Sequence, residues 1–149
     1  MYYITKMFGP FPFAHRQHKH SGHCSLIHGH NWYFEICLKS GDLDENGFVY
    51  DFGKFKWLKS WLEETFDHTI VINEDDPYHG LFHVLHEQGL MKMITLRNCS
   101  SEALAKHVYQ YIQDRMMKQP SSDRNLELLW VKVYEDEKNK AIYKPEDNQ

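Results

Sequence analysis

Residues 24–34 read CSLIHGHNWYF and place two histidines, His28 and His30, on either side of a glycine. The aromatic and apolar residues that follow, as far as Lys39, are typical of a β-strand. Side chains two residues apart on a strand point to the same face of a sheet. We therefore expect the two imidazoles side by side. Such a pair taken alone is more often ordinary strand residues than metal ligands, and it favours a metal site only together with His15 and the nearby Cys24.

The preceding residues supply a partner for this strand. Residues 2–13, YYITKMFGPFPF, predict a first strand that is bent at Gly9-Pro10, because proline cannot donate to a strand ladder. Residues 16–27 are polar and lack a period, which indicates a loop. Residues 40–47, SGDLDENG, are turn residues that close the second strand. The first 50 residues therefore predict a long hairpin.

Two helices and a second hairpin are expected in the rest of the chain. Apolar residues at steps of three and four predict a helix over 51–66 with Asp51 as its N-cap, and a second helix begins at Ser100 or Ser101. The remaining expected elements are an extended piece at 67–73, a short helix at 76–89 closed by Gly89, a strand at 90–96, a loop at 118–125, and a hairpin of 126–136 with 140–144. This order predicts a single α+β domain over 1–149, with a four-stranded antiparallel sheet and two main helices on one face.

Composition excludes several classes of protein. The chain has 149 residues, of which 42% are hydrophobic and 15% aromatic, as in a folded globular protein. A net charge of −4 without a basic face argues against nucleic acid as a partner. No stretch is long and apolar enough for a signal peptide or a membrane span. The three cysteines (Cys24, Cys37 and Cys99) are too few for a disulfide framework, so a cytoplasmic protein is expected.

Histidine is unusually frequent in this chain. The chain has 11 histidines, and six of them lie within residues 15–30. A catalytic zinc site usually has three protein ligands, so His28 and His30 need a third, which should come from a neighbouring strand. His15 ends the first strand and is our candidate, although His18, His20 or His23 in the loop can take its place.

Six short motifs occur in one order along the chain. They are FPFAH at 11–15, CSLIHGHN at 24–31, GFVYDF at 47–52, DH at 67–68, SSE at 100–102 and VKVYE at 131–135. Together they resemble the 6-pyruvoyl-tetrahydropterin synthase / 6-carboxy-tetrahydropterin synthase family, from about residue 3 to residue 143. The resemblance implies the tunnelling fold (T-fold), with homo-oligomers built from trimeric barrels that usually stack into hexamers. It also implies zinc bound by His15, His28 and His30.

The same resemblance assigns the remaining site residues. Cys24 lies in a polar loop beside histidines, where a thiolate is better stabilised than in an apolar core, and it matches the family's proton-abstracting base. Asp67 and His68 match the pair that completes a proton-transfer set with the thiol, which can be assembled across a subunit interface. Glu135 matches the glutamate that accepts hydrogen bonds from the amino-pyrimidine edge of a pterin. Ser100, Ser101 and Glu102 match positions near the same substrate.

The implied reaction has two known outcomes. The substrate implied is 7,8-dihydroneopterin triphosphate, converted either to a 6-pyruvoyl product or to 6-carboxytetrahydropterin with acetaldehyde. Cys24 lies four residues before His28, as in the bacterial carboxy-forming branch that feeds queuosine synthesis, whereas the animal pyruvoyl branch has a wider gap. We therefore favour the carboxy-forming lyase. A non-catalytic metal-binding protein is the alternative from another class.

The chain also departs from the family at three places. Phe13 occupies a position where a small residue is usual, and Cys99 one where proline is common. Residues 74–96 form a longer connection than in many members. These departures concern the surroundings of the metal site rather than its three histidines.

Overall fold

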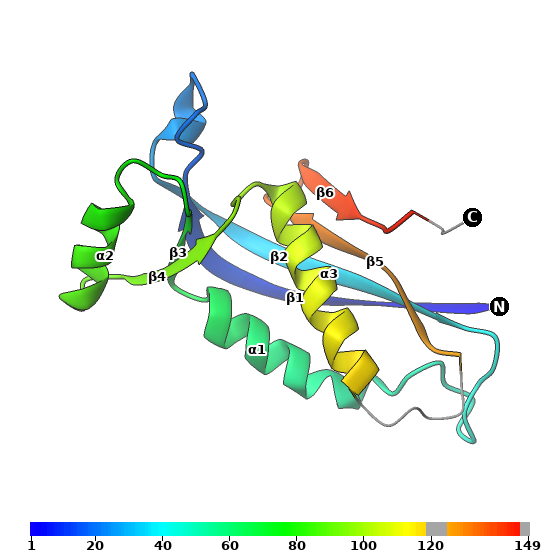
Figure 1. The fold of residues 1–149 in the computed structure, drawn as a ribbon. Coiled ribbons are helices and arrows are strands. Elements are labelled where there is room, and N and C mark those ends of the chain that lie inside the picture. The colour runs from blue at the N-terminus through cyan, green and yellow to red at the C-terminus, as the bar shows by residue number, and fades with distance from the viewer. Residues whose placement is uncertain (119–124, 147–149) are drawn as a thin grey trace.

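The computed structural model describes residues 1–118 and 125–146 (Figure 1). Its strands are β1 (Tyr2–His15), β2 (His28–Ser40), β3 (Thr69–Asn73), β4 (Lys92–Leu96), β5 (Glu127–Tyr134) and β6 (Lys140–Tyr143). Its helices are α1 (Lys56–Phe66), α2 (His79–Glu87) and α3 (Ser101–Lys118), with short 3₁₀ helices η1 (His23–Ser25) and η2 (Phe52–Phe55). None of the described helices is long and apolar enough to cross a membrane.

The sheet is mixed and its strand order is β4-β3-β1-β2-β5-β6. The two predicted hairpins are confirmed, because β1 pairs antiparallel with β2, and β5 pairs antiparallel with both β2 and β6. The α+β class is confirmed as well, but the prediction of four antiparallel strands was wrong. β3 pairs parallel with the end of β1, and β4 pairs parallel with β3. All five residues of β3 are buried. The segment that we expected only as an extended piece is therefore an inner strand that enlarges the sheet.

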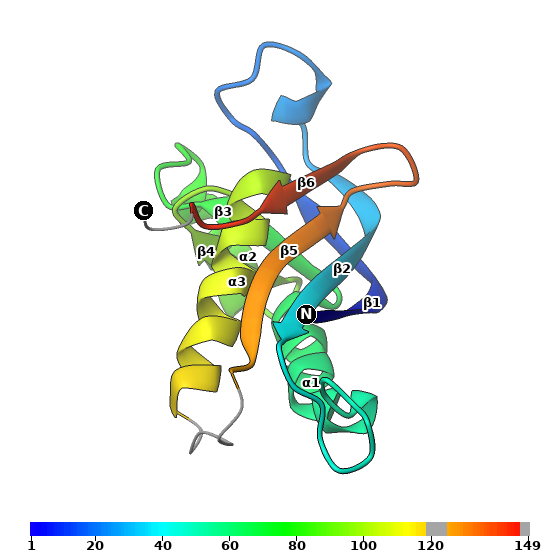
Figure 2. The same ribbon diagram turned by 90° about the vertical axis from the view of Figure 1, so that its right-hand side faces the viewer.

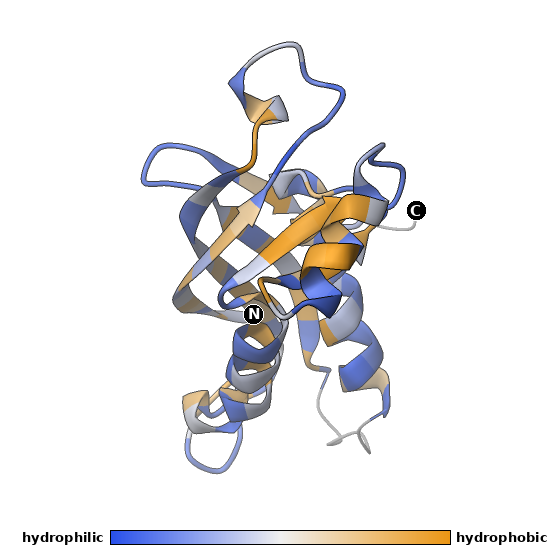
Figure 3. Ribbon diagram, turned by 90° about the vertical axis from the view of Figure 1, so that its left-hand side faces the viewer, coloured by the Kyte–Doolittle hydropathy of each residue, from blue (hydrophilic) through white to orange (hydrophobic). Residues whose placement is uncertain are grey.

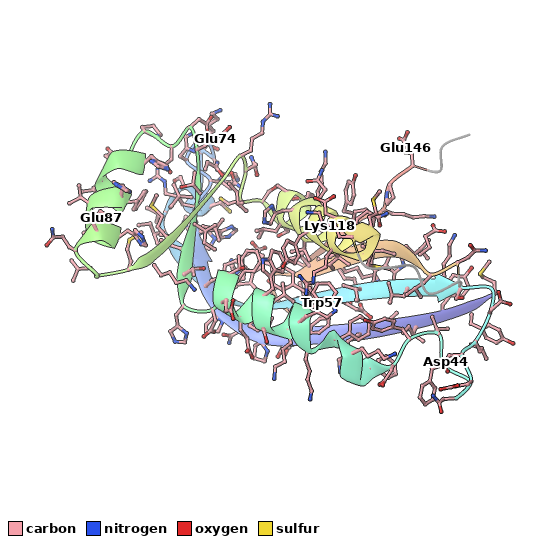
Figure 4. The ribbon with its side chains drawn as sticks, turned by 60° about the horizontal axis from the view of Figure 1, so that its bottom comes forward. Asp44, Trp57, Glu74, Glu87, Lys118 and Glu146 are labelled. Carbon is pink, nitrogen blue, oxygen red and sulfur yellow. The ribbon has the colours of Figure 1, made fainter. Side chains whose placement is uncertain are left out.

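Helices α1 and α3 cover the same face of the sheet, as predicted (Figures 1 and 2). That face carries Phe13, Trp32 and Phe34, which belong to one core cluster together with residues of both helices. The rings of Trp61 on α1 and Tyr111 on α3 stack at a centroid distance of 3.6 Å. Figure 4 shows side chains of α1, Trp57 among them, filling the space between the two helices. The packed core between helices and sheet therefore reaches Phe13 and Trp32, close to the end of the sheet where β1 stops and β2 begins.

The predicted helices are present, but α2 begins at His79 rather than at residue 76, and the residues directly after Asp51 form η2 instead of the first turn of α1. The Asp51 carboxylate accepts a hydrogen bond from the Gly53 amide at 2.8 Å, but it caps the 3₁₀ helix η2 rather than α1 itself. Ser100 Oγ accepts from the Ala103 amide at 3.2 Å and caps α3. Gly89 follows α2 with φ of +72° and ends it. The predicted loop at 118–125 lies mostly outside the described residues.

The connection over residues 74–96 has a small core of its own. Phe82 on α2 packs with Ile70 and Ile72 of β3, and Met91 and Met93 border them. Figure 3, viewed from the side of α2, shows hydrophobic segments in both strand and helix on this side of the molecule. This excursion is therefore a folded extension of the sheet.

Gly9 marks the predicted bend in β1. The pairing register with β2 shifts between Phe8 and Phe11, which is a β-bulge. Gly9 has φ of +119°, and a Cβ placed there would lie 2.6 Å from the Trp32 carbonyl oxygen. Only glycine fits a position with both constraints.

We predict that Gly9→Ala destabilises the protein by about 1–3 kcal/mol, since the substitution combines backbone strain with a steric clash. The free energy of unfolding from urea titration measures the effect. Gly80→Ala in α2 is the matched control, because a Cβ there meets nothing within 4 Å. Equal stabilities of the parent and Gly9→Ala would contradict the geometry of this bulge.

Candidate metal centre

Three histidines meet at the end of the sheet from which the loop between β1 and β2 projects (Figure 1). His15, the last residue of β1, pairs in register with His28, the first residue of β2, and Phe13 pairs with His30. The His15 ring centroid lies 4.6 Å from that of His28 and 5.5 Å from that of His30. The predicted juxtaposition of His28 and His30 on one face is confirmed, and antiparallel pairing adds His15 to them.

Glu135 joins this group from a third strand. It follows β5 directly, and its Oε1 lies 3.4 Å from His15 Nε2 and 3.3 Å from His30 Nε2. One ligand atom from each of the three histidines and from Glu135 lies within 4.8 Å of all the others, a grouping that can hold a metal ion. We refer to His15, His28, His30 and Glu135 as the ion site.

The hydrogen bonds of two histidines fix their tautomers. His15 Nδ1 lies 2.8 Å from the Cys99 carbonyl oxygen, and His28 Nδ1 lies 2.7 Å from the Leu26 carbonyl oxygen. A carbonyl oxygen only accepts, so each neutral ring carries its proton on Nδ1 and leaves Nε2 as a bare lone pair. Imidazoles that bind metals are commonly held in this way by the second nitrogen.

The lone pairs inside the site have no hydrogen-bond donor. The Nε2 atoms of His15 and His30 are buried and make no hydrogen bond among the described residues, although the Glu135 oxygen is close. An ionised carboxylate is also only an acceptor. The lone pair of His15 Nε2 and the Glu135 carboxylate therefore repel each other unless a cation lies between them. The residues present therefore fit a metal ion.

Burial keeps two of the imidazoles neutral. Removal from water lowers the pKa of His15, an effect that the Cys99 hydrogen bond and the Glu135 charge oppose. Removal from water also lowers the pKa of His30, against the opposing charge of Glu135. Neutral imidazole is the form that binds metals, so the environment favours the form that an ion needs.

Trp32 supports the imidazoles from below. It is fully buried, and its ring meets those of His15 and His30 edge-on at centroid distances of 4.9 and 5.1 Å. Its Nε1 donates to the Phe13 carbonyl oxygen at 3.0 Å, and the Phe13 ring stacks on it at 4.5 Å. The bulky residue at position 13 therefore packs in the core beneath the site.

The other loop histidines point elsewhere. His18 contacts Asn73 and the two acidic residues Asp75 and Asp76 of the excursion. His20 accepts a hydrogen bond from the Gly22 amide at 2.8 Å. Neither of these two, nor His23, belongs to the ion site. Of the candidates for the third ligand, the structure brings His15 to the other two histidines.

The predicted proton-transfer residues lie apart within one chain. Cys24 is exposed in η1, beyond the end of β1. His68 has φ of +55° and lies after α1, where its Nδ1 contacts Asp67 Oδ2 at 2.9 Å and its amide donates to the Pro12 carbonyl. Both Asp67 and His68 are exposed. Among the described residues no contact joins Cys24 to this pair.

The residues at the start of α3 lie close to the ion site, because Cys99 precedes them and holds His15. Ser100 uses its hydroxyl as a helix cap, and Ser101 and Glu102 form the first turn of α3. Cys99 is fully buried, and removal from water raises the pKa of its thiol to about 11. At neutral pH this thiol is protonated, which makes it a poor general base.

Sequence reasoning missed three supports of the site. The carbonyl groups of Leu26 and Cys99 and the ring of Trp32 orient the ligands, yet the sequence placed none of them there. For Trp32 a signal existed, because it follows His28 and His30 at the same two-residue step and therefore shares their face. The proximity of Glu135 to the histidines was missed as well, since the sequence analysis considered it only as a substrate residue.

Comparison with known proteins covers all four residues of the ion site. Residues 3–146 match the family model of 6-pyruvoyl tetrahydropterin synthase. The chain belongs to this family. Membership makes it an enzyme of the lyase class and confirms the resemblance drawn from the six motifs.

Individual relatives carry two different names. The chain is 29% identical over 84% of its length to a 6-carboxy-5,6,7,8-tetrahydropterin synthase of Rickettsia conorii, covering 88% of that protein. It is 32% identical over 83% of its length to the enzyme of the same name from Aquifex aeolicus, covering 76% of it. The solved structure of Caenorhabditis elegans 6-pyruvoyl tetrahydropterin synthase superposes with a TM-score of 0.62 at 27% identity, covering 97% of each chain.

We predict that the purified chain binds about one divalent transition-metal ion, as three histidines at one point suggest. His28→Ala should remove most of it, as measured by metal analysis after dialysis. His20→Ala is the matched control, since His20 lies in the same histidine-rich segment but outside the ion site. Full metal content in His28→Ala, or loss in His20→Ala, would contradict the assignment.

Proposed function

We propose that this chain is a zinc-dependent 6-carboxy-5,6,7,8-tetrahydropterin synthase. It would convert 7,8-dihydroneopterin triphosphate to 6-carboxytetrahydropterin, acetaldehyde and triphosphate, a step toward queuosine. The observation that carries the proposal is the convergence of His15, His28 and His30 with Glu135, in a chain that is similar to the two proteins of that name from Rickettsia conorii and Aquifex aeolicus. Three nitrogen ligands on two paired strands suit a zinc ion with an open position.

His15, His28 and His30 would hold the zinc ion. A bound zinc polarises oxygens of the substrate's side chain and stabilises the negative charge that follows proton loss. The chain's own part is to orient His15 and His28 through their hydrogen bonds to the Cys99 and Leu26 carbonyls, and to favour the neutral form of His15 and His30 by burial. The buried Trp32 holds water away from the inner side of the ligands.

Cys24 and His68 would move protons, with Asp67 orienting the imidazole. The 2.9 Å contact between Asp67 and His68 supports this arrangement, because a carboxylate at Nδ1 fixes the ring and stabilises its charged form. Cys24 is exposed, as a residue that meets substrate has to be. Since Cys24 has no contact with the pair within the described chain, we propose that a second copy brings them together in a trimer-based homo-oligomer.

Glu135 would anchor the pterin, with Ser100, Ser101 and Glu102 nearby. A pterin held by its amino-pyrimidine edge carries its side chain at the opposite end of the fused ring. Glu135 can therefore serve as anchor only after its carboxylate turns away from His15 and His30, which it now approaches to 3.4 and 3.3 Å. Until then its negative charge lies beside the histidines of the ion site and favours a bound cation.

The carboxy-forming outcome is favoured by two observations. The two relatives described above are named for that product, and the four-residue step from Cys24 to His28 limits where the thiol can stand relative to the ion. A base acts only within about 3 Å of the proton that it takes, so a short loop selects one carbon of the side chain. The likeness to the nematode 6-pyruvoyl enzyme keeps triphosphate elimination as the second candidate.

We predict that Cys24→Ala binds zinc and a pterin normally but turns over about 10²–10⁴-fold more slowly, the usual contribution of a general base. Steady-state kinetics and metal analysis on the same sample measure both properties. Cys37→Ala is the control, because Cys37 is buried in β2 away from the ion site. Near-normal turnover of Cys24→Ala would assign the base elsewhere.

Glu135→Gln should separate the two uses of that side chain. As a pterin anchor, its loss weakens pterin binding by about 1.5–3 kcal/mol, the value of a hydrogen bond to a charged group, while the three histidines still hold the metal. Calorimetric titration with a pterin and chelator competition for the metal give the two affinities. Reduced metal affinity with unchanged pterin binding would make Glu135 a metal ligand instead.

The product decides between the two reactions. Incubation with 7,8-dihydroneopterin triphosphate should release acetaldehyde and triphosphate in equal amounts, measured by enzymatic acetaldehyde assay and chromatography. Triphosphate together with a 6-pyruvoyl product, and without acetaldehyde, would favour the second candidate. Neither product from zinc-loaded protein would favour a non-catalytic metal-binding protein.

A further inference from the structure

His15 is held by a residue that lies far from it in sequence. Its Nδ1 donates to the carbonyl oxygen of Cys99, which follows β4 and precedes α3. Both side chains are buried, at 3% and 0% exposure. The direction of the His15 ring therefore depends on where the Cys99 carbonyl points.

The Cys99 peptide is held in turn by Asn73, the last residue of β3. The Cys99 amide donates to Asn73 Oδ1 at 2.8 Å, and Asn73 is 3% exposed. The Cys99 thiol donates to the Arg16 carbonyl oxygen at 3.1 Å. Three groups of Cys99 thus bind two separate parts of the chain: His15 with the residue after it, and the end of β3.

We propose that Asn73 and Cys99 are positioning residues for the ion site. Asn73 fixes the Cys99 peptide, and the Cys99 carbonyl then fixes the tautomer and direction of the His15 ring. The inference deepens the proposed function, because it concerns the affinity of the same site for its metal. Outer-shell groups of this kind raise metal affinity because they orient a ligand before the ion arrives.

The residue type at position 99 makes this arrangement possible. Proline, which is common at this position in the family, has no N–H and cannot donate to Asn73. Cysteine supplies the N–H and also the thiol that reaches Arg16. The hydrogen bond between Cys99 and Asn73 therefore closes the excursion at its base, and it depends on the departure from the family at position 99.

Ion pairs tie the excursion to the chain beyond His15. Arg16 Nε donates to Asp76 Oδ2 at 2.7 Å, and Asp76 is buried. Lys19 pairs with Asp75 at 2.7 Å at the surface. Figures 1 and 4 show the chain around Glu74, where it leaves β3, beside the loop that follows β1. These pairs thus hold the start of the excursion to the residues that follow His15.

Two substitutions at position 73 test the acceptor. Asn73→Ala removes it and leaves the buried Cys99 amide unpaired, whereas Asn73→Asp keeps an acceptor oxygen at the same place. The matched control is Asn98→Ala, which removes a similar bond, from the Ser100 amide to an asparagine oxygen at 2.8 Å, at an exposed site one residue from Cys99. Each variant is studied as the full chain, metal-free and loaded.

The readouts are the zinc dissociation constant, from competition with a chromogenic chelator, and the absorption spectrum of the cobalt-substituted protein. We expect Asn73→Ala to weaken zinc binding about 10–100-fold and to alter the cobalt spectrum, while Asn73→Asp and Asn98→Ala stay close to the parent. Unchanged zinc affinity and spectrum in Asn73→Ala would overturn the proposal, as would an equal loss in Asn98→Ala.

Measurements on the metal-free parent keep the test decisive if Asn73→Ala does not fold. By NMR, the Cys99 amide should exchange slowly with solvent, and His15 should carry its proton on Nδ1. Rapid exchange of this amide, or a proton on Nε2 of His15, would refute the positioning role. Failure of the parent to bind zinc would contradict the proposed function but leave these two measurements interpretable.

Discussion

Acceptor atoms that converge without a donor are the constraint on which this structure depends. The Nε2 atoms of His15 and His30 are buried beside a carboxylate oxygen of Glu135, and the His28 ring lies against them. The carbonyl oxygens at Nδ1 of His15 and His28 leave the Nε2 lone pair of each ring directed into the site. Such a cluster is costly in the absence of a cation, and the fold bears that cost at the end of its sheet.

The fold supports the site on three levels. Antiparallel register between β1 and β2 brings the three histidines together, and the core below supplies Trp32 and Phe13 as a rigid base. The excursion through α2 and β4, which follows β3, then returns the chain to Cys99, whose carbonyl contacts His15. The proposed proton-transfer residues are arranged differently, because Cys24 and the Asp67–His68 pair are exposed on separate segments. That separation is the reason for proposing that a second copy completes the set.

Much of this arrangement follows from local sequence. The two-residue step from His28 to His30 predicts their shared face, and the strand before them supplies His15 once antiparallel pairing is assumed. The parallel addition of β3 was not predictable in the same way, since a short apolar segment reveals its burial but not its partner strand. The contact between Cys99 and His15 spans 84 residues and uses backbone atoms, so residue type gives no sign of it. Glu135 was predicted as a site residue, but its distance to the histidines required the register of β5 on β2.

X-ray absorption at the zinc edge, together with anomalous diffraction from a zinc-loaded crystal, tests the central claim most directly. Our account predicts one ion bound by three imidazole nitrogens at about 2.0–2.1 Å, and the anomalous peak should lie between His15, His28 and His30. A peak held by His18, His20 or His23, or a first shell dominated by sulfur, would contradict it.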